Sequence, residues 1–255
     1  MPIITLTTDF GLQDYYVATL KGALLQKSNQ LNIIDISHNI NHYDIVQAAF
    51  VLKNAFNHFP SNTIHLVCVN NYVSAEPSII VAKHWGHYFV VPDNGLMALL
   101  FEELPKEMYR IYLQHDSTSP MRTAYAKIVQ YLVEERPLDV LAEHVNHIIQ
   151  RISLQPVIGT SQIRGTVIYI DHYENAVVNI TKDLFYRIRQ DRDFALYFKR
   201  YDPITTISNY YYDVQVGDVL CLFNTANYLE IAINMGRASG LLGLAVDDAV
   251  QIDFS

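Results

Sequence analysis

The chain has 255 residues, of which 50% are hydrophobic and 17% are charged, a composition typical of a folded globular protein with one or two domains. Its formal net charge of −8 disfavours a general nucleic-acid binder, which needs clustered Lys and Arg. The sequence contains no signal-peptide pattern and no apolar run of membrane-spanning length, so we expect a cytoplasmic protein that does not contact a membrane.

The first part of the chain alternates predicted strands with predicted helices. Strands are expected at 3–8, 31–37, 63–69 and 110–114, helices at 14–28, 44–59, 95–101 and 123–135, and a hairpin around Trp85 and Gly86. Asp44 is suited to cap the second helix. Such alternation predicts an α/β domain, residues 1–155, with a mainly parallel sheet and helices on both faces.

The pattern changes after about Pro156. Short segments with period-two alternation follow one another, among them "IRGTVIYIDHYENAVVNIT", "VLCLFNT" and "AVQIDFS". We therefore expect a small antiparallel β-domain, barrel-like, over residues 156–255. Cys68 and Cys221 both lie in apolar runs and are expected to be buried hydrophobic residues without a disulfide.

Asp9 and Asp14 follow the first predicted strand, in "TTDFGLQDYY". Ligands of open α/β sheets bind at the carboxyl ends of strands, and a carboxylate can accept two hydrogen bonds from a diol. We favour a ligand-binding role for Asp9 over a turn residue, whereas Asp14 serves equally well as a helix cap. Asp93 and Asn94 occupy a turn before the third helix, where structural support is favoured over binding.

Two segments of the β-domain carry polar side chains that could contact a ligand. In "IDHYENAVVNI", Asp171, Tyr173 and Asn175 share one face if the chain is extended, but a hairpin turn at Glu174 and Asn175 is an equal alternative. In "LFNTANYLEIAINMG" a turn at 224–227 precedes an apolar run. Its candidate site groups are Thr225, Glu230 and the backbone near Met235, and Glu230 could be either buried with partners or solvated on an edge strand.

The segment "VCVNNYVSAEPS", residues 67–78, occupies the position of a ligand-binding loop, but Glu76 is its only charged residue. The histidines show no metal-ligand spacing, so we expect no metal site. From the residues alone, the chain is predicted to bind a small ligand with polar and aromatic groups.

Five segments together resemble the S-adenosyl-L-methionine (SAM) hydroxide adenosyltransferases, relatives of the SAM-dependent fluorinases and chlorinases. They are "TLTTDFG", "ISHNINHYDIVQAAFVL", "HYFVVPDNG", "YIDHYENAVVNI" and "YLEIAINMG", and they occur in the family's order along nearly the whole chain. The resemblance implies a homotrimer that binds SAM between the α/β domain of one subunit and the β-domain of its neighbour. Water or halide attacks the 5′-carbon and methionine leaves, without a cofactor.

The resemblance also assigns roles to individual positions. Asp9 matches the acid that binds the ribose hydroxyls, Asp14 an acid near the methionine end, and Tyr43 an aromatic residue against the ligand. In the β-domain the matching residues are Asp171 near the methionine ammonium, Tyr173 and Asn175 around adenine, Thr225 near the amino-acid end, and the backbone near Met235 at adenine.

The sequence departs from the family where the water is handled. The hydrolases use an Asp–Arg–His trio, but the matching positions here are Asn70, Pro77 and Pro120 or Met121, with only Arg122 of the neighbouring motif retained. The expected function is hydrolysis of SAM to adenosine and methionine at an altered water site. Asn70 would orient the water, and Glu76 would act as a substitute base with Arg122 nearby. The alternative is a non-catalytic binder of SAM or adenosine, and a halogenase ranks third.

Overall fold

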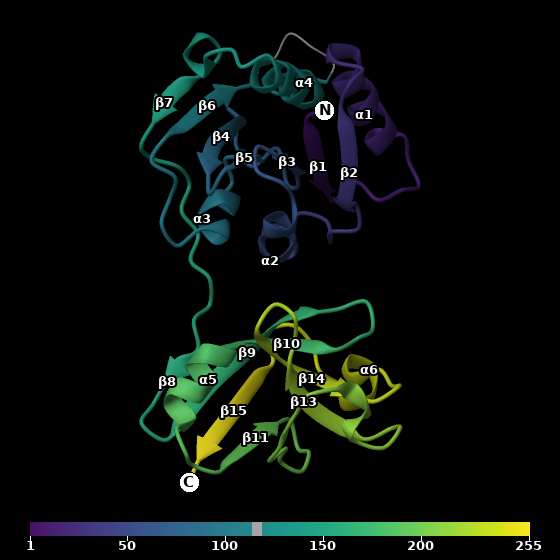
Figure 1. The fold of residues 1–255 in the computed structure, drawn as a ribbon, viewed down its shortest axis with the longest axis vertical. Coiled ribbons are helices and arrows are strands. Elements are labelled where there is room, and N and C mark those ends of the chain that lie inside the picture. Colours follow the sequence, from purple (N-terminus) through teal and green to yellow (C-terminus); the bar gives the residue numbers. More distant parts are fainter. Residues whose placement is uncertain (114–118) are drawn as a thin grey trace. The chain divides into compact units, whose positions relative to one another are not determined.

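The computed structural model describes residues 1–113 and 119–255, and the chain divides into two compact units, Met1–Ser153 and Leu154–Ser255 (Figure 1). The sequence prediction placed the domain boundary between residues 155 and 156. No helix of the described part is long and apolar enough to cross a membrane.

The first unit is built on a seven-stranded sheet with the order β2-β1-β3-β5-β4-β6-β7. The strands β2, β1, β3 and β5 are parallel to one another, whereas β4, β6 and β7 pair antiparallel with their neighbours. Their bounds are β1 Ile3–Thr8, β2 Asn32–Ser37, β3 Ile64–Cys68, β4 Ser78–His84, β5 His87–Pro92, β6 Met108–Tyr112 and β7 Glu143–Val145. The predicted α/β class is confirmed, with a mixed sheet whose parallel half is N-terminal.

Helices cover both faces of this sheet (Figure 1). On one face α1 (Tyr16–Lys27) and α4 (Pro120–Val133) pack over one hydrophobic cluster, and on the other α2 (Ile45–Ala55) and α3 (Leu96–Leu100) pack over a second. Strand β3 serves both clusters, because Leu66 and Cys68 belong to the first and Val67 to the second. Because β3 is buried on both faces, its sequence is a continuous apolar run instead of an alternating pattern.

The local predictions for the first unit are confirmed at two places and corrected at one. The hairpin joins β4 and β5 across Trp85 and Gly86, and the side chain of Asp44 accepts a hydrogen bond from the Gln47 amide at the start of α2. Asp14 is not a helix cap, because α1 is preceded by Tyr15. Gln114, the end of one predicted strand, lies outside the described residues.

The second unit is an eight-stranded, almost wholly antiparallel sheet with the order β11-β15-β9-β10-β14-β13-β12, with β8 paired to β9. Only β12 and β13 are parallel. The bounds are β8 Val157–Ile158, β9 Gln162–Ile170, β10 Ala176–Thr181, β11 Phe194–Phe198, β12 Ile207–Ser208, β13 Val219–Phe223, β14 Tyr228–Ile233 and β15 Ala249–Phe254, with helices α5 Lys182–Arg189 and α6 Ala238–Leu242.

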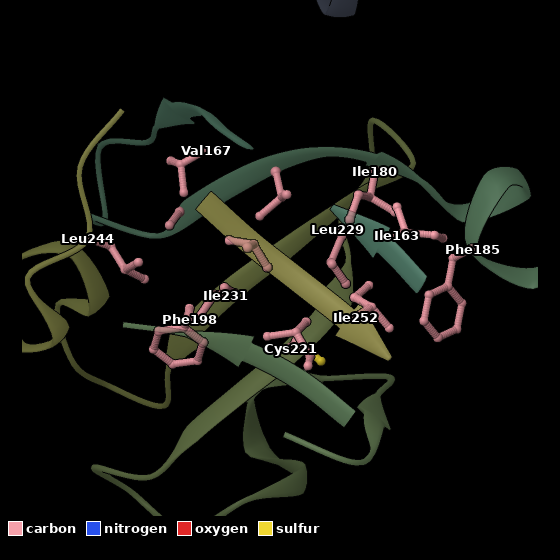
Figure 2. Packing of buried hydrophobic residues seen from close by; sticks show 14 of the residues in the cluster. Ile163, Val167, Ile180, Phe185, Phe198, Cys221, Leu229, Ile231, Leu244 and Ile252 are labelled. Carbon is pink, nitrogen blue, oxygen red and sulfur yellow. The ribbon is translucent and has the colours of Figure 1, made fainter. Parts of the chain in front are cut away.

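The sheet of the second unit curls around a main hydrophobic core, and a smaller cluster consists of Leu220, Leu222 and Ala232. Figure 2 shows how side chains from different strands, such as Ile163, Leu229 and Ile252, point toward one another, with Phe185 of α5 at one end of the cluster. Cys221 lies within this core as a free, buried thiol, as the sequence predicted, and Cys68 is also free and buried. The predicted β-domain with a curled sheet is confirmed.

Candidate functional site

Asp9 lies at the carboxyl end of β1, where backbone amides from two other segments converge on its carboxylate. The Tyr43 amide donates to Asp9 Oδ2 at 3.1 Å, and the Asn70 amide donates to the same oxygen at 3.2 Å. Among the described residues, no hydrogen bond to Oδ1 occurs. The carboxylate is therefore held in place by one oxygen, and its other oxygen can accept hydrogen bonds from a ligand.

The two residues that hold Asp9 adopt left-handed backbone conformations. Tyr43 has φ +65° and Asn70 has φ +50°. The left-handed region is tolerated by Asn but is uncommon for a residue such as Tyr, and such conformations concentrate at functional sites. Tyr43 is 71% exposed, so its ring is available at the surface beside Asp9.

Asp93 and Asn94 hold the backbone segments around this site together. The Asn94 side-chain amide donates to the carbonyl oxygens of Val69 and Asn70 at 3.0 and 3.1 Å. Asp93 Oδ2 accepts two hydrogen bonds from Arg110, and its Oδ1 accepts one from the Ile149 amide. The predicted structural role of this pair is confirmed, because both side chains tie backbone segments together.

A cavity of about 430 Å³ lies next to the Asp9 corner in the first unit. It is bounded by both segments in which the family resemblance places the water site. Its lining includes Asn71 and Tyr72 from the loop after β3, and Ser119, Met121 and Arg122 from the start of α4. Of the three residues predicted to handle water, Arg122 lines the cavity. Asn70 lies instead beside Asp9, and Glu76 is an exposed residue outside the lining.

The side chain of Asp14 is exposed in the segment before α1. Its neighbours Tyr15 and Tyr16 line the cavity, together with Thr19 and Leu20 of the same helix. The structure therefore places Asp14 close in sequence to the cavity wall but does not give it a described hydrogen-bond partner. Its role near the methionine end stays a prediction.

In the second unit, Asp171, Tyr173 and Asn175 lie in the turn between β9 and β10. Asp171 Oδ1 accepts from the Asn175 amide at 2.8 Å, and its Oδ2 accepts from the Asn175 side chain at 3.0 Å. Glu174 has φ +65°, typical of a tight turn. The hairpin alternative is thus correct and the shared face of an extended strand is wrong, because the chain reverses here. Tyr173 remains 75% exposed.

Glu230 is buried in the middle of the sheet, with an exposure of 3%. Strand β14 lies between β10 and β13, so the alternative of a solvated Glu on an edge strand is wrong. The Tyr211 hydroxyl donates to Glu230 Oε1 at 2.7 Å, and the Asn224 side chain donates to Oε2 at 3.0 Å. Both oxygens of the buried acid are therefore satisfied, as burial requires.

Burial and neighbouring acids shift the titration of this cluster. Burial, opposed by its two hydrogen bonds and reinforced by nearby Asp171, raises the pKa of Glu230. Burial, followed by the hydrogen bond to Glu230, raises the pKa of the Tyr211 phenol. Asp171 also contributes to the shift at Tyr211, which places the turn and the buried acid in one electrostatic cluster.

Thr225 and Met235 lie at two further turns of the second unit. Thr225 is exposed in the β13–β14 turn, which the sequence predicted, and Met235 follows β14 with φ +56° and an exposure of 86%. Their side chains are accessible to a ligand, in contrast to Glu230.

Sequence reasoning missed two sets of residues. One is the cavity wall, above all Asn71, whose Oδ1 is buried without a hydrogen-bond partner among the described residues. The other is Tyr211 and Asn224, the partners of Glu230. Asn71 adjoins Asn70 in the loop that the sequence analysis predicted to bind the ligand, so it could have been named. The donors to Glu230 come from segments whose position in the sequence does not indicate that they contact it.

Comparison with known proteins finds the family that the sequence resembles, over nearly the whole chain. Residues 4–142 match the SAM hydroxide adenosyltransferase N-terminal domain, and residues 165–251 match the C-terminal domain of that family. A relative from Methanocaldococcus jannaschii, named (R)-S-adenosyl-L-methionine hydrolase, is 29% identical and is aligned over 99% of this chain and 96% of its own length. A Thermus thermophilus protein of the same name is 24% identical over 93% of this chain and 94% of its own.

The fold is shared as well. The crystal structure of an uncharacterized conserved protein from Thermotoga maritima superposes with a TM-score of 0.87 and 27% identity, covering 98% of this chain and 99% of that one. A conserved hypothetical protein from Thermus thermophilus gives a TM-score of 0.78 at 23% identity over 100% of both chains, a likeness of fold alone. Because both family domains match in order and together span most of the sequence, the chain belongs to the SAM hydroxide adenosyltransferase family.

Proposed function

We propose that this protein cleaves SAM at the 5′-carbon with water, giving adenosine and methionine. The observation that carries the proposal is the carboxylate of Asp9, anchored through Oδ2 by the amides of Tyr43 and Asn70. The free side of the carboxylate would accept hydrogen bonds from the two ribose hydroxyls. Family membership and the names of the relatives support SAM as the ligand.

Holding the ribose supplies the positioning that this displacement needs. Alignment of the nucleophile with the bond from the 5′-carbon to sulfur accounts for much of the acceleration in such reactions. The sulfonium loses its positive charge as methionine leaves, so a pocket that excludes water favours the reaction. The proposal requires no cofactor, and it includes assembly of the chain as a homotrimer.

The water site is the altered part of this proposal. Asn70 would orient a water through its amide, Arg122 would contribute from the cavity wall, and Glu76 would have to reach inward from its exposed loop to act as a base. Loss of a general base typically lowers a rate by about 10²- to 10⁴-fold. We therefore expect turnover that is slow, because positioning remains while proton removal is weakened.

The names of the relatives also suggest which epimer of SAM is used. Each is named for the (R) form, which differs from the (S) form in configuration at the sulfonium sulfur. We propose that this protein also prefers (R)-SAM. Incubation with each epimer, followed by chromatography of adenosine and methionine, tests the preference; equal rates would contradict it.

The central test compares the wild-type protein with Asp9→Ala and with the control Asp191→Ala, an exposed acid in the second unit. Asp9→Ala is expected to lower adenosine formation by about a hundredfold, because two charge-assisted hydrogen bonds to the ribose are lost. The Asp191→Ala rate should equal that of the wild type. Undiminished adenosine formation in Asp9→Ala would exclude the proposed role.

The second candidate function is non-catalytic binding of SAM or adenosine. It is favoured by Asn70, because an amide stands where the family keeps its water-handling acid. Calorimetric titration with SAM, run beside the turnover assay, separates the two functions. Binding without release of adenosine or methionine supports the binder, whereas stoichiometric formation of both products supports the hydrolase.

A further inference from the structure

The cavity of the first unit adjoins the position where the 5′-carbon would be held. Phe10, the residue after Asp9, lines it, and the Asp9 amide donates to the carbonyl oxygen of Cys68, which also lines it. Asn71 also lines it and follows Asn70, whose amide donates to Asp9. A molecule in this cavity would therefore sit next to a ribose bound at Asp9.

The polar groups of the cavity wall suit an anion. Among the described residues, Arg122 lines it, no carboxylate lines it, and none forms an ion pair with Arg122. Cys68 adds no negative charge, because burial raises the pKa of its thiol. The described part of the wall therefore presents one cation without a compensating acid.

The size and the remaining wall suit an organic molecule. The volume of about 430 Å³ is far larger than the roughly 30 Å³ that a water occupies in the liquid. Most of the surface is aromatic or apolar, from Phe10, Tyr16, Leu20 and Met121 among others. Pockets of this kind bind small molecules through an apolar body and a few placed polar groups.

We propose that the cavity binds a small organic carboxylate with an apolar or aromatic body, held by Arg122, and that this carboxylate accepts the adenosyl group of SAM. One carboxylate oxygen forms a bond to the 5′-carbon, and the bond from that carbon to sulfur breaks with its electron pair remaining on sulfur. The products are methionine and the 5′-ester of adenosine. The inference rests on the proposed cleavage of SAM at this carbon.

This step explains the composition of the altered loop. A water nucleophile must lose a proton, and the family trio that handles it is absent here. A carboxylate is already deprotonated, so the step transfers no proton and needs no general base. The negative carboxylate and the positive sulfonium both become neutral, which a pocket lined by aromatic residues favours.

Binding is tested first, without SAM. Calorimetric titrations with acetate, hexanoate and benzoate compare the wild type with Arg122→Met, Arg122→Lys and the control Arg136→Met, an exposed arginine beyond α4. Hexanoate and benzoate should bind more tightly than acetate. Arg122→Met should weaken benzoate binding at least tenfold, and Arg122→Lys and Arg136→Met should stay within about threefold of wild type. Absence of binding by all three probes, or equal affinity in Arg122→Met, would overturn the site.

Transfer is tested by incubating the wild-type protein with SAM and benzoate in H₂¹⁸O. We expect the adenosine benzoate ester by mass spectrometry, together with adenosine whose 5′-oxygen is ¹⁶O, because it comes from the carboxylate after ester hydrolysis. Adenosine that carries only ¹⁸O would overturn transfer while supporting the proposed hydrolase. If SAM is not consumed with or without benzoate, both the transfer step and the proposed hydrolase activity are wrong. The binding titrations then still test whether Arg122 holds a carboxylate in the cavity.

Discussion

Asp9 in the first unit and Glu230 in the second are both acids near polar turns, but the fold uses them differently. Asp9 is held through one oxygen by two backbone amides, and its other oxygen has no described partner. Glu230 is buried, and each of its oxygens accepts a hydrogen bond from a side chain. An acid that retains an open oxygen can bind a ligand, whereas one with both oxygens occupied mainly maintains structure.

This contrast sharpens the roles expected from sequence. Glu230 was predicted as a substrate-binding residue together with Thr225 and Met235, but only the latter two are accessible. We therefore expect Glu230 to act indirectly, by holding Tyr211 and the β13–β14 turn at Asn224. The following predictions test the contrast, from the largest expected effect to the smallest.

Glu230→Leu should lower the free energy of unfolding by about 3 kcal/mol, because it leaves the Tyr211 hydroxyl and the Asn224 amide without their buried acceptor. Urea unfolding followed by circular dichroism measures the change, with Asp191→Leu as the exposed control. A change below about 1 kcal/mol would mean that Glu230 is not a structural acid.

A fall in pH should change the stabilities of the two units in opposite directions, through His65 in the first and Glu230 in the second. In the first unit, His65 is buried and is hydrogen-bonded to Thr5 and His87. Burial, followed by the nearby His87, lowers the pKa of His65 from 6.5 to about 3. The unfolded chain therefore binds the proton first, and stability is lost as the pH falls from about 6.5 toward 3, by ~2 kcal/mol at pH 5.

Glu230 has the opposite sign. Its pKa is raised in the folded chain, so its contribution to stability is complete at low pH and is lost as the pH rises through the folded-state pKa. Hydrogen exchange at pH 7 and pH 5, corrected for intrinsic rates, should show loosening of strands β1, β3 and β5 but not of β14. Equal loosening of both units would contradict the opposite signs assigned to His65 and Glu230. As a control, His65→Phe should reduce the loss of stability of the first unit at low pH.

Asn70→Asp tests whether the loss of an acid limits turnover. If water is the nucleophile, adenosine formation should rise by about tenfold, because a base is restored next to the proposed ribose site. Steady-state assays with SAM measure the change, and Asn70→Ala serves as the matched variant without a base. An unchanged rate in Asn70→Asp would show that proton removal does not limit the reaction, as expected for a carboxylate acceptor.

Asp9→Ala should have the smallest effect on stability even though it is expected to abolish most of the activity. It removes one acceptor oxygen shared by two amides at the carboxyl end of β1, where water can replace it, so a loss of about 1 kcal/mol or less is expected. Urea unfolding measures this. A loss as large as that of Glu230→Leu would show that Asp9 is mainly a structural acid.

Much of the fold could be predicted because its signals are local. Alternating apolar residues marked the β-domain strands, Asp44 marked the start of α2, and Trp85-Gly86 marked a hairpin. The prediction was wrong where one sequence pattern is compatible with two local structures. A β9–β10 turn and an extended strand both accommodate alternating polar residues at 171–175, and only pairing with neighbouring strands distinguishes them.

The sequence by itself determined the order of the elements, the two-part organisation and the residues that carry the family resemblance, since these depend on local patterns and motifs in chain order. Tertiary structure alone decided which groups meet. It brought the amides of Tyr43 and Asn70 to Asp9, placed Asn71 and Arg122 on the wall of one cavity, and placed the Tyr211 hydroxyl on Glu230. Such contacts join residues far apart in the chain, so no local spacing encodes them, and they determine which acid stays open to a ligand.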